Sequence, residues 1–246
     1  MRKIIFAMAC MVLPGWVMAS GGEAHLMSVD IDLANQASLQ KGAKTFVNYC
    51  LNCHSASFMR YSRMAKDLGL SEEEVQQNML FTGAKIGEPM TIAMPKEQAK
   101  KWFGVVPPDL SVIARARGVD WVYTYLKSFY ADPARPFGVN NLVFKDVGMP
   151  HVLGELQGIP QAVYGESHEE GAHGKKIVVG SKPGTPGKQT EAEYDQTVRD
   201  LVNFIAYMGE PAKLERQKLG VKVLLFLLFF TVLAYLLKKE YWKDVH

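Results

Sequence analysis

The sequence predicts a mainly α-helical domain with long irregular loops, followed by one transmembrane helix near the C-terminus. Apolar residues recur at helical spacing in several segments between residues 38 and 129, and again between 198 and 208. Residues 131–190 are instead rich in glycine and proline, and they favour loops with one short strand near 176–179. Residues 221–237 are almost wholly apolar, which is typical of a helix that crosses a membrane.

The chain begins with a segment that has the parts of a secretory signal peptide. Two basic residues precede an apolar run at 4–13, and a small-x-small cleavage site ends at Ala19. An uncleaved anchor helix is the alternative, but Pro14 interrupts the apolar run before it is long enough to cross a bilayer. We therefore expect residues 1–19 to be removed and the rest of the N-terminal part to be exported.

The next helix runs from about Ser38 directly into Cys50-Leu51-Asn52-Cys53-His54. This Cys-x-x-Cys-His spacing indicates covalent haem, because two thiols on one turn can bond to the same porphyrin while the adjacent imidazole binds the iron. Half of a zinc site is one alternative, but the sequence has no later cysteine to complete it. A thioredoxin-like redox pair is another, although it does not require the histidine. Cys10 falls in the predicted signal peptide, so the mature chain would keep the haem pair alone.

Capping boxes mark two further helices. Ser71 opens one that should end near Leu80, and Thr190 opens one that should end at Gly209. A helix before the haem motif and another that closes the domain resemble the cytochrome c fold, in which these two helices cross. We therefore expect the same crossing in this chain.

Proline, aspartate and glycine mark the helices between these two. A short helix should follow Pro95 and end near Gly104. Asp109 is predicted to cap a helix that Gly118 closes, and Asp120 is predicted to cap a helix that includes Phe129 and ends at Asp132-Pro133. The segment that contains His168 and His173 is hydrophilic and interrupted by glycine, which is more typical of a solvated loop than of a metal site.

The apolar run near the C-terminus sets the membrane topology. Counted from Leu219, its 19 residues span roughly 28 Å at about 1.5 Å per residue, which is enough to cross a bilayer. A buried core helix is the alternative, but no polar face is visible. With an exported N-terminal part, the sequence divides into a signal peptide (1–19), a periplasmic haem domain (20–212), and an anchor with a short cytoplasmic tail (213–246).

The charge is distributed unevenly along the chain. Residues 20–210 carry 19 Lys/Arg and 22 Asp/Glu, so the folded part is mildly acidic although the whole chain has a formal charge of +3. This disfavours nucleic acid as a partner and is compatible with docking of a basic protein.

Further motifs follow the haem signature in a fixed order. They are Pro107-Pro108-Asp109-Leu110-Ser111, Arg115-Ala116-Arg117 and Gly148-Met149-Pro150, and the anchor comes last. In this order the chain resembles the cytochrome c1 family over its whole length. Some members of that family brace the haem domain with a disulfide, for which this chain has no cysteines.

The resemblance implies the roles of individual residues. Cys50 and Cys53 would carry the thioethers, and His54 would be the proximal ligand of the iron. Met149 would be the distal ligand. Pro108 would lie against the haem, and Arg115 or Arg117 would lie near a propionate, for which a guanidinium fork is well shaped.

Two methionines that precede prolines are candidates for the sixth iron ligand. Met94 lies between a glycine-rich loop and a charged helix start, whereas Met149 lies in the irregular segment expected to cover the haem. A ligand opposite His54 should come from a different segment that folds back over the porphyrin, which favours Met149. Core packing is the expected role of the other methionine.

The resemblance also implies a function. The chain would be an electron carrier and the haem subunit of the respiratory ubiquinol–cytochrome c oxidoreductase, in the inner membrane with cytochrome b and a Rieske iron–sulfur protein. Electrons would arrive from the Rieske protein and leave to a soluble or tethered cytochrome c. An independent anchored monohaem shuttle is the alternative. A haem peroxidase or a gas-binding cytochrome is less favoured, because both need an open or displaceable sixth position.

Overall fold

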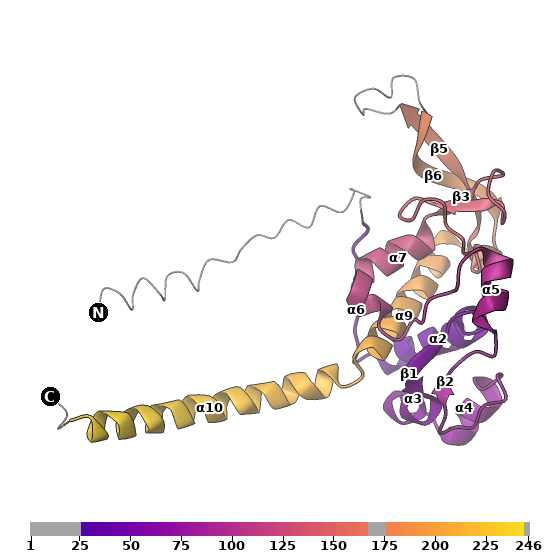
Figure 1. Ribbon diagram of the computed structural model, residues 1–246. Helices are drawn as coiled ribbons and strands as arrows, with labels where there is room; N and C mark the ends of the chain where they lie inside the picture. The colour runs from indigo at the N-terminus through magenta and orange to yellow at the C-terminus, as the bar shows by residue number, and fades with distance from the viewer. Residues whose placement is uncertain (1–25, 167–175, 244–246) are drawn as a thin grey trace.

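The computed structural model of the chain describes residues 26–166 and 176–243 (Figure 1). The predicted signal peptide and the histidines at 168 and 173 lie outside these residues. In chain order the elements are α2 (Gln36–Thr45), the π-helical turn η1 (Phe46–Cys50), β1 (Ala56–Arg60), α3 (Tyr61–Leu68), α4 (Glu72–Asn78), β2 (Pro89–Met90), α5 (Lys96–Phe103), α6 (Ile113–Arg117), α7 (Val119–Lys127), β3 (Phe129–Ala131), β4 (Val139–Asn141), α8 (Gly154–Gln157), β5 (Gly158–Glu166), β6 (Lys176–Pro186), α9 (Glu191–Gly209) and α10 (Lys213–Tyr241). The prediction of a mainly helical domain with one C-terminal apolar helix is confirmed.

The main core lies around the crossing of α2 and α9, which confirms the expected arrangement of these helices (Figure 1). Gly42 permits the close approach, because a Cβ at this position would lie 2.0 Å from the backbone oxygen of Asp200. Next to the crossing, the rings of Phe46 and Phe204 lie 5.6 Å apart. The crossing therefore fixes the direction in which α2 enters the Cys-x-x-Cys-His motif.

Several predicted helix boundaries are confirmed. Ser71 and Thr190 form complete capping boxes at the starts of α4 and α9. Gly104, with φ of 76°, ends α5 in the left-handed conformation that glycine adopts without strain.

The predicted caps of α6 and α7 are wrong. The residue at the N-cap position of α6 is Val112, and Asp109 lies further upstream. The Asp109 carboxylate accepts hydrogen bonds from Ser57 and Ser111 instead. Asp120 lies inside the first turn of α7 and accepts a hydrogen bond from the backbone of Val29. Both carboxylates thus accept hydrogen bonds from backbone amides outside the first turn of their helices. Short polar side chains commonly bond such nearby groups instead of capping a helix.

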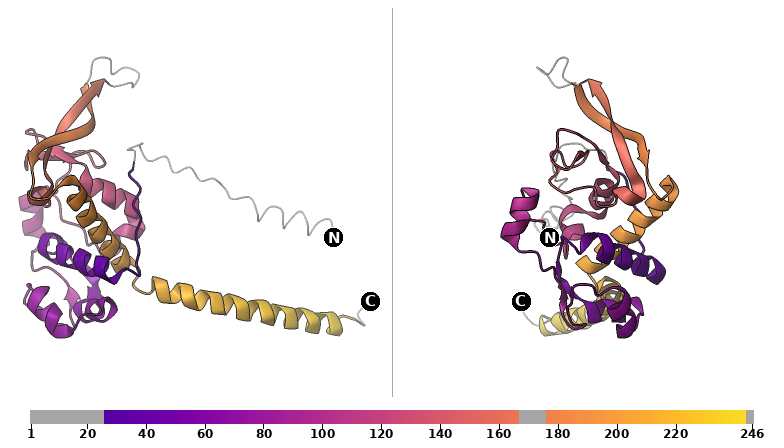
Figure 2. Two further views of the ribbon diagram at one scale, coloured as in Figure 1. Left: turned by 180° about the vertical axis from the view of Figure 1, so that it is seen from behind. Right: turned by 90° about the vertical axis from the view of Figure 1, so that its right-hand side faces the viewer.

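The region after α7 is the largest difference from the prediction. Helix α7 ends at Lys127, and Phe129 begins a strand rather than continuing the helix to Asp132-Pro133. Four strands form a sheet in the order β4-β3-β5-β6, with β3 parallel to β5 and the other pairs antiparallel. The expected short strand near 176–179 belongs to the longer β6, whose partner β5 was not predicted. The hairpin of β5 and β6 projects from the domain (Figure 2).

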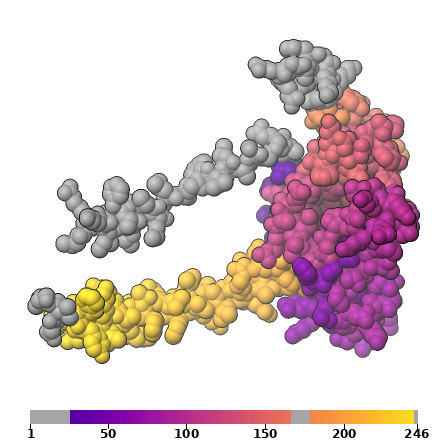
Figure 3. Space-filling view, in the orientation of Figure 1, coloured from indigo at the N-terminus to yellow at the C-terminus, as the bar shows by residue number. Residues whose placement is uncertain are grey.

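Helix α10 leaves the domain as a separate rod (Figure 3). It is 29 residues long and buries none of them against the rest of the described chain. At about 1.5 Å per residue it is long enough to cross a bilayer. Its length and composition match the predicted membrane span.

Candidate functional site

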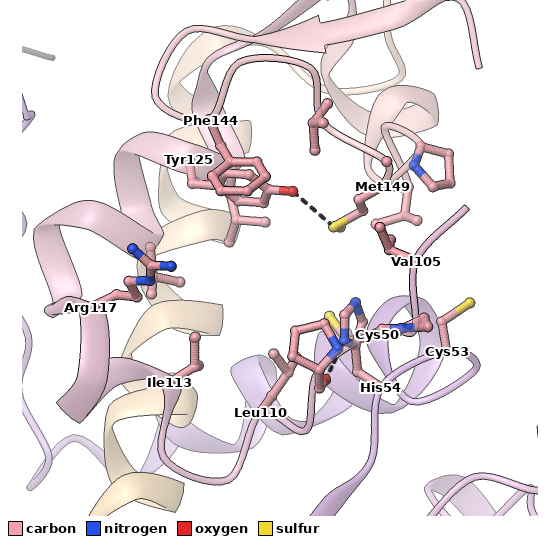
Figure 4. Close-up of a pocket in the computed structure, with 18 of the residues that line it drawn as sticks. Cys50, Cys53, His54, Val105, Leu110, Ile113, Arg117, Tyr125, Phe144 and Met149 are labelled. Atoms are coloured by element: carbon pink, nitrogen blue, oxygen red, sulfur yellow. Dashed lines mark hydrogen bonds between the residues drawn. The ribbon is translucent and has the colours of Figure 1, made fainter. Parts of the chain in front are cut away.

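The Cys-x-x-Cys-His motif forms a tight turn at the end of η1. The backbone amides of Cys53 and His54 both donate to the carbonyl oxygen of Cys50, at 3.1 and 2.9 Å. The turn brings both thiols and the imidazole to one wall of a cavity (Figure 4). Burial, with a smaller effect from neighbouring Cys53, raises the pKa of the Cys50 thiol to about 12. A thioredoxin-like pair needs a thiol that ionises readily, so this environment disfavours that alternative.

His54 is held in one orientation by the Pro-Pro-Asp-Leu segment. Its Nδ1 lies 2.7 Å from the carbonyl oxygen of Pro108. Because a carbonyl oxygen can only accept, Nδ1 carries the proton and Nε2 keeps a free lone pair for a metal. The residue is 8% exposed, and burial lowers the pKa of the imidazole, although the Pro108 carbonyl and Asp109 oppose this. Neutral imidazole is the form that binds iron.

The Pro108 segment is itself fixed against the motif. The backbone amide of Leu110 donates to the carbonyl oxygen of Ser55 at 2.8 Å, and the Asp109 carboxylate accepts from the Ser57 hydroxyl at 2.7 Å. These bonds place the Pro108 carbonyl where His54 needs an acceptor. The motif and the Pro-Pro-Asp-Leu segment, more than 50 residues apart, therefore form one unit.

The opposite wall of the cavity is the loop that carries Met149 (Figure 4). Gly148 lets this loop approach the segment after α5, because a Cβ there would lie 3.0 Å from a methyl carbon of Val105 and 3.2 Å from the Phe103 carbonyl oxygen. The Met149 sulfur accepts a hydrogen bond from the Tyr125 hydroxyl at 3.3 Å. Burial raises the pKa of Tyr125, so this hydroxyl stays protonated and able to donate.

Two asparagines that the sequence analysis missed hold the loop in place. The Asn141 side-chain oxygen accepts from the backbone amides of Val143 and Phe144, at 2.9 and 3.1 Å. The Asn140 side-chain oxygen accepts from the amide of Asp146 at 2.9 Å. The Asn-Asn pair that follows Pro133, Pro136 and Gly138 is a turn signal that could have indicated this role.

The cavity between the two walls has a volume of about 460 Å³, within the range of cofactor sites. Apolar side chains from α6, α7, α9 and the loops line most of it. The polar and metal-binding groups that line it include the two thiols, the imidazole of His54, the thioether of Met149, Arg117 and Asp146. An apolar slot with two possible axial ligands and two adjacent thiols fits a covalently bound haem.

The remaining predicted site residues lie in different places. Arg117 lines the cavity, with its guanidinium 5.2 Å from the centre of the Trp121 ring. Arg115 does not line the cavity. Its side chain packs beside Gly209, since a Cβ added to Gly209 would lie 3.3 Å from the Arg115 Cγ. Met94 is half-buried just before α5 and also lies outside the cavity lining.

A helical domain with this cavity, followed by an apolar helix long enough to cross a membrane, fits the class of c-type cytochromes that carry a C-terminal anchor. Comparison with known proteins gives the family. The profile of the Cytochrome C1 family matches residues 185–245. Cytochrome c1 of Allochromatium vinosum is 57% identical over 246 residues, which cover 100% of both chains. The chain therefore belongs to the cytochrome c1 family, which implies a haem cofactor and electron transfer in respiration.

Two further similarities were found. A protein of Nitrosomonas europaea named ammonia monooxygenase gamma subunit is 49% identical over 247 residues, again with 100% of both chains covered. A chain of a hyperthermophilic respiratory complex III has a TM-score of 0.44 at 15% sequence identity, over 100% of this chain and 98% of that one.

Proposed function

We propose that the chain binds one haem c through thioether bonds at Cys50 and Cys53, with His54 and Met149 as the axial ligands of the iron. When bound, the haem supplies a one-electron Fe(III)/Fe(II) couple. One observation carries the most weight. The imidazole and the thioether lie on opposite sides of one apolar cavity, which both thiols also line (Figure 4).

The residues around this site suit electron transfer better than chemistry on a substrate. The Pro108 carbonyl fixes the imidazole of His54, and the soft thioether of Met149 favours the ferrous state. With both His54 and Met149 bound, the iron would have no open position, which disfavours the haem peroxidase and the gas-binding cytochrome. Arg117 is the arginine we assign to a propionate, because it lines the cavity and a guanidinium fork matches a carboxylate.

The chain is an electron-transfer subunit of a respiratory cytochrome bc1 complex. Its partner in the membrane is cytochrome b, and we assign a Rieske protein as electron donor and a cytochrome c as acceptor. Residues 1–19 would be the cleaved signal peptide, and residues 20–212 the periplasmic haem domain. Residues 213–246 would hold this domain at the inner membrane with the C-terminus in the cytoplasm. This anchor suits a relay between fixed partners.

The axial ligand can be tested with two methionine variants. Met149→Leu should keep covalent haem but lose the weak long-wavelength absorption band of a Met–Fe(III) bond, and its reduction potential should fall because the soft ligand is gone. Met94→Leu is the matched control, since Met94 also precedes a proline but lies outside the cavity lining, and it should leave both properties unchanged. Loss of the band in the Met94 variant alone would show that the assignment is wrong.

The partners can be tested by purification. The tagged full-length chain, extracted in mild detergent, should copurify with a dihaem cytochrome b and a Rieske protein. Isolation of the chain without either partner would favour the independent shuttle. Copurification with subunits of an ammonia-oxidising enzyme would instead favour the role suggested by the name of the Nitrosomonas relative.

A further inference from the structure

Tyr125 and Met149 meet across the cavity from different elements (Figure 4). Tyr125 belongs to α7, whereas Met149 lies in the loop that forms the wall opposite His54. The Tyr125 hydroxyl donates a hydrogen bond to the Met149 sulfur over 3.3 Å. Among the residues that the structure describes, the Tyr125 hydroxyl has no other hydrogen-bond partner.

The ring of Tyr125 is held firmly enough to aim this hydroxyl. The indole of Trp121 stacks on it, with centroids 5.1 Å apart and planes 11° from parallel. Phe129 packs edge-on at 5.3 Å and 72°. The Tyr125 carbonyl oxygen accepts from the Asn141 side-chain amide at 2.7 Å, which ties the end of α7 to the residue that shapes the Met149 loop. The same asparagine therefore connects the positions of the donor and the acceptor.

The sulfur can keep this contact while it binds a metal. A thioether sulfur has two lone pairs, so one can bind iron while the second accepts from the phenol. A hydrogen bond to the second lone pair withdraws electron density from the sulfur and makes it a weaker donor. Fe(III) loses more than Fe(II) when a ligand donates less, so the hydrogen bond favours the reduced state.

We propose that Tyr125 is a positioning residue for the sixth iron ligand, and that its hydroxyl raises the reduction potential of the haem through the Met149 sulfur. This rests on the proposed ligation by Met149. The competing explanation is that the sulfur merely satisfies a hydroxyl in an apolar cavity, as partly buried tyrosines usually require. The two explanations differ because a purely structural contact would not change the potential.

The test compares two conservative variants in the full-length, haem-loaded chain. Tyr125→Phe removes the hydroxyl and keeps the ring between Trp121 and Phe129. Tyr207→Phe is the matched control, because it also removes a phenol hydroxyl that donates a hydrogen bond, to Asp67 at 2.8 Å, but Tyr207 lies outside the cavity lining. Redox titration gives the potential of each variant, and the ferric absorption spectrum reports whether the Met–Fe(III) bond is present.

We expect Tyr125→Phe to keep the Met–Fe(III) band and to lower the potential. An ordinary neutral hydrogen bond changes an equilibrium constant by about two- to tenfold. A tenfold change in the one-electron redox equilibrium corresponds to about 59 mV, which sets the upper end of the expected fall in potential. Tyr207→Phe should leave the potential unchanged. An unchanged or raised potential in Tyr125→Phe, or an equal fall in both variants, would overturn the role of the hydroxyl.

Met149→Leu separates the two levels of the proposal. If Tyr125→Phe has no effect while Met149→Leu loses the band, the ligation stands and the role of Tyr125 is wrong. If Met149→Leu keeps the band, the proposed ligation is wrong and the role of Tyr125 fails with it.

Discussion

Replacement of Gly42 by alanine should destabilise the domain, because this glycine lies where α2 and α9 cross. A Cβ here would lie 2.0 Å from the Asp200 carbonyl oxygen and 2.7 Å from the Phe204 Cβ. Neither atom can move away by a change of rotamer, since one is backbone and the other is the first atom of a buried side chain. The two helices must therefore separate.

Two opposing effects set the size of the loss. Overpacking costs about 1–3 kcal/mol, and a clash with backbone belongs at the upper end, about 3 kcal/mol. Alanine gains about 1 kcal/mol over glycine in a helix interior, so the net loss should be about 2 kcal/mol. For a domain of this size each kcal/mol lowers the midpoint temperature by about 2–4 °C, which gives a fall of about 4–8 °C.

Circular dichroism during heating of the full-length chain in detergent measures this effect. Gly220→Ala is the helical control, because Gly220 lies in α10 and, apart from its chain neighbours and the nearby backbone of α10, no described atom lies within 4 Å of the position that a Cβ would take. It should not lower the midpoint temperature. A midpoint for Gly42→Ala equal to or above that of the unchanged chain would refute the view that this crossing has no room for a methyl group.

Three other properties can be predicted. A chain that ends after Glu210 should be exported, bind haem and remain in solution, because α9 ends at Gly209 and α10 buries nothing; a membrane-bound product after a high-salt wash would contradict this. Electron transfer to a basic cytochrome c should slow as salt rises, because exposed charges are screened over about 8–10 Å near physiological ionic strength; a rate independent of salt would argue against docking by charge. Burial raises the pKa of Asp195, but hydrogen bonds from Lys127, Tyr123 and Arg199 outweigh it and lower the pKa below its usual value. Stability from this carboxylate is therefore present above about pH 4, its unfolded pKa, and is lost as the pH falls. Asp195→Asn should lower the midpoint temperature at neutral pH, by an amount that shrinks in acid, and a constant difference would exclude ionisation as the cause.

The sequence was most informative where a structural feature depends on residues that are close together in the chain. Cys50 to His54 lie on one turn, so their shared wall follows from local geometry alone. The capping boxes at Ser71 and Thr190 are equally local, and both were predicted correctly. The contact between Tyr125 and Met149 could not be predicted in this way, because it depends on how the loop after β4 folds back over α7.

The sheet was missed for a physical reason that its register makes clear. Pro160 lies in β5 and Pro183 in β6, and prolines and glycines within a segment normally argue against strands. Both prolines fall where the pairing is irregular, since the register shifts between Ile159 and Gln161. In addition, β6 is an edge strand, where a missing backbone donor costs little. Long-range pairing therefore overrode a local composition that favours loops.

The two walls of the cavity are held by different parts of the fold. The wall with His54 is carried by α2 and η1, which pack into the main core against α9. The wall with Met149 is held by β3 and β4 instead. Asn140 and Asn141 bond its backbone, and a small separate apolar cluster includes Phe129, Val139 and Val147. A disturbance of this second cluster can therefore displace the thioether while the thiols and the imidazole keep their places. The proposed sixth ligand is thus the part of the site whose position can change without loss of the domain, and it is the part on which we propose that Tyr125 acts.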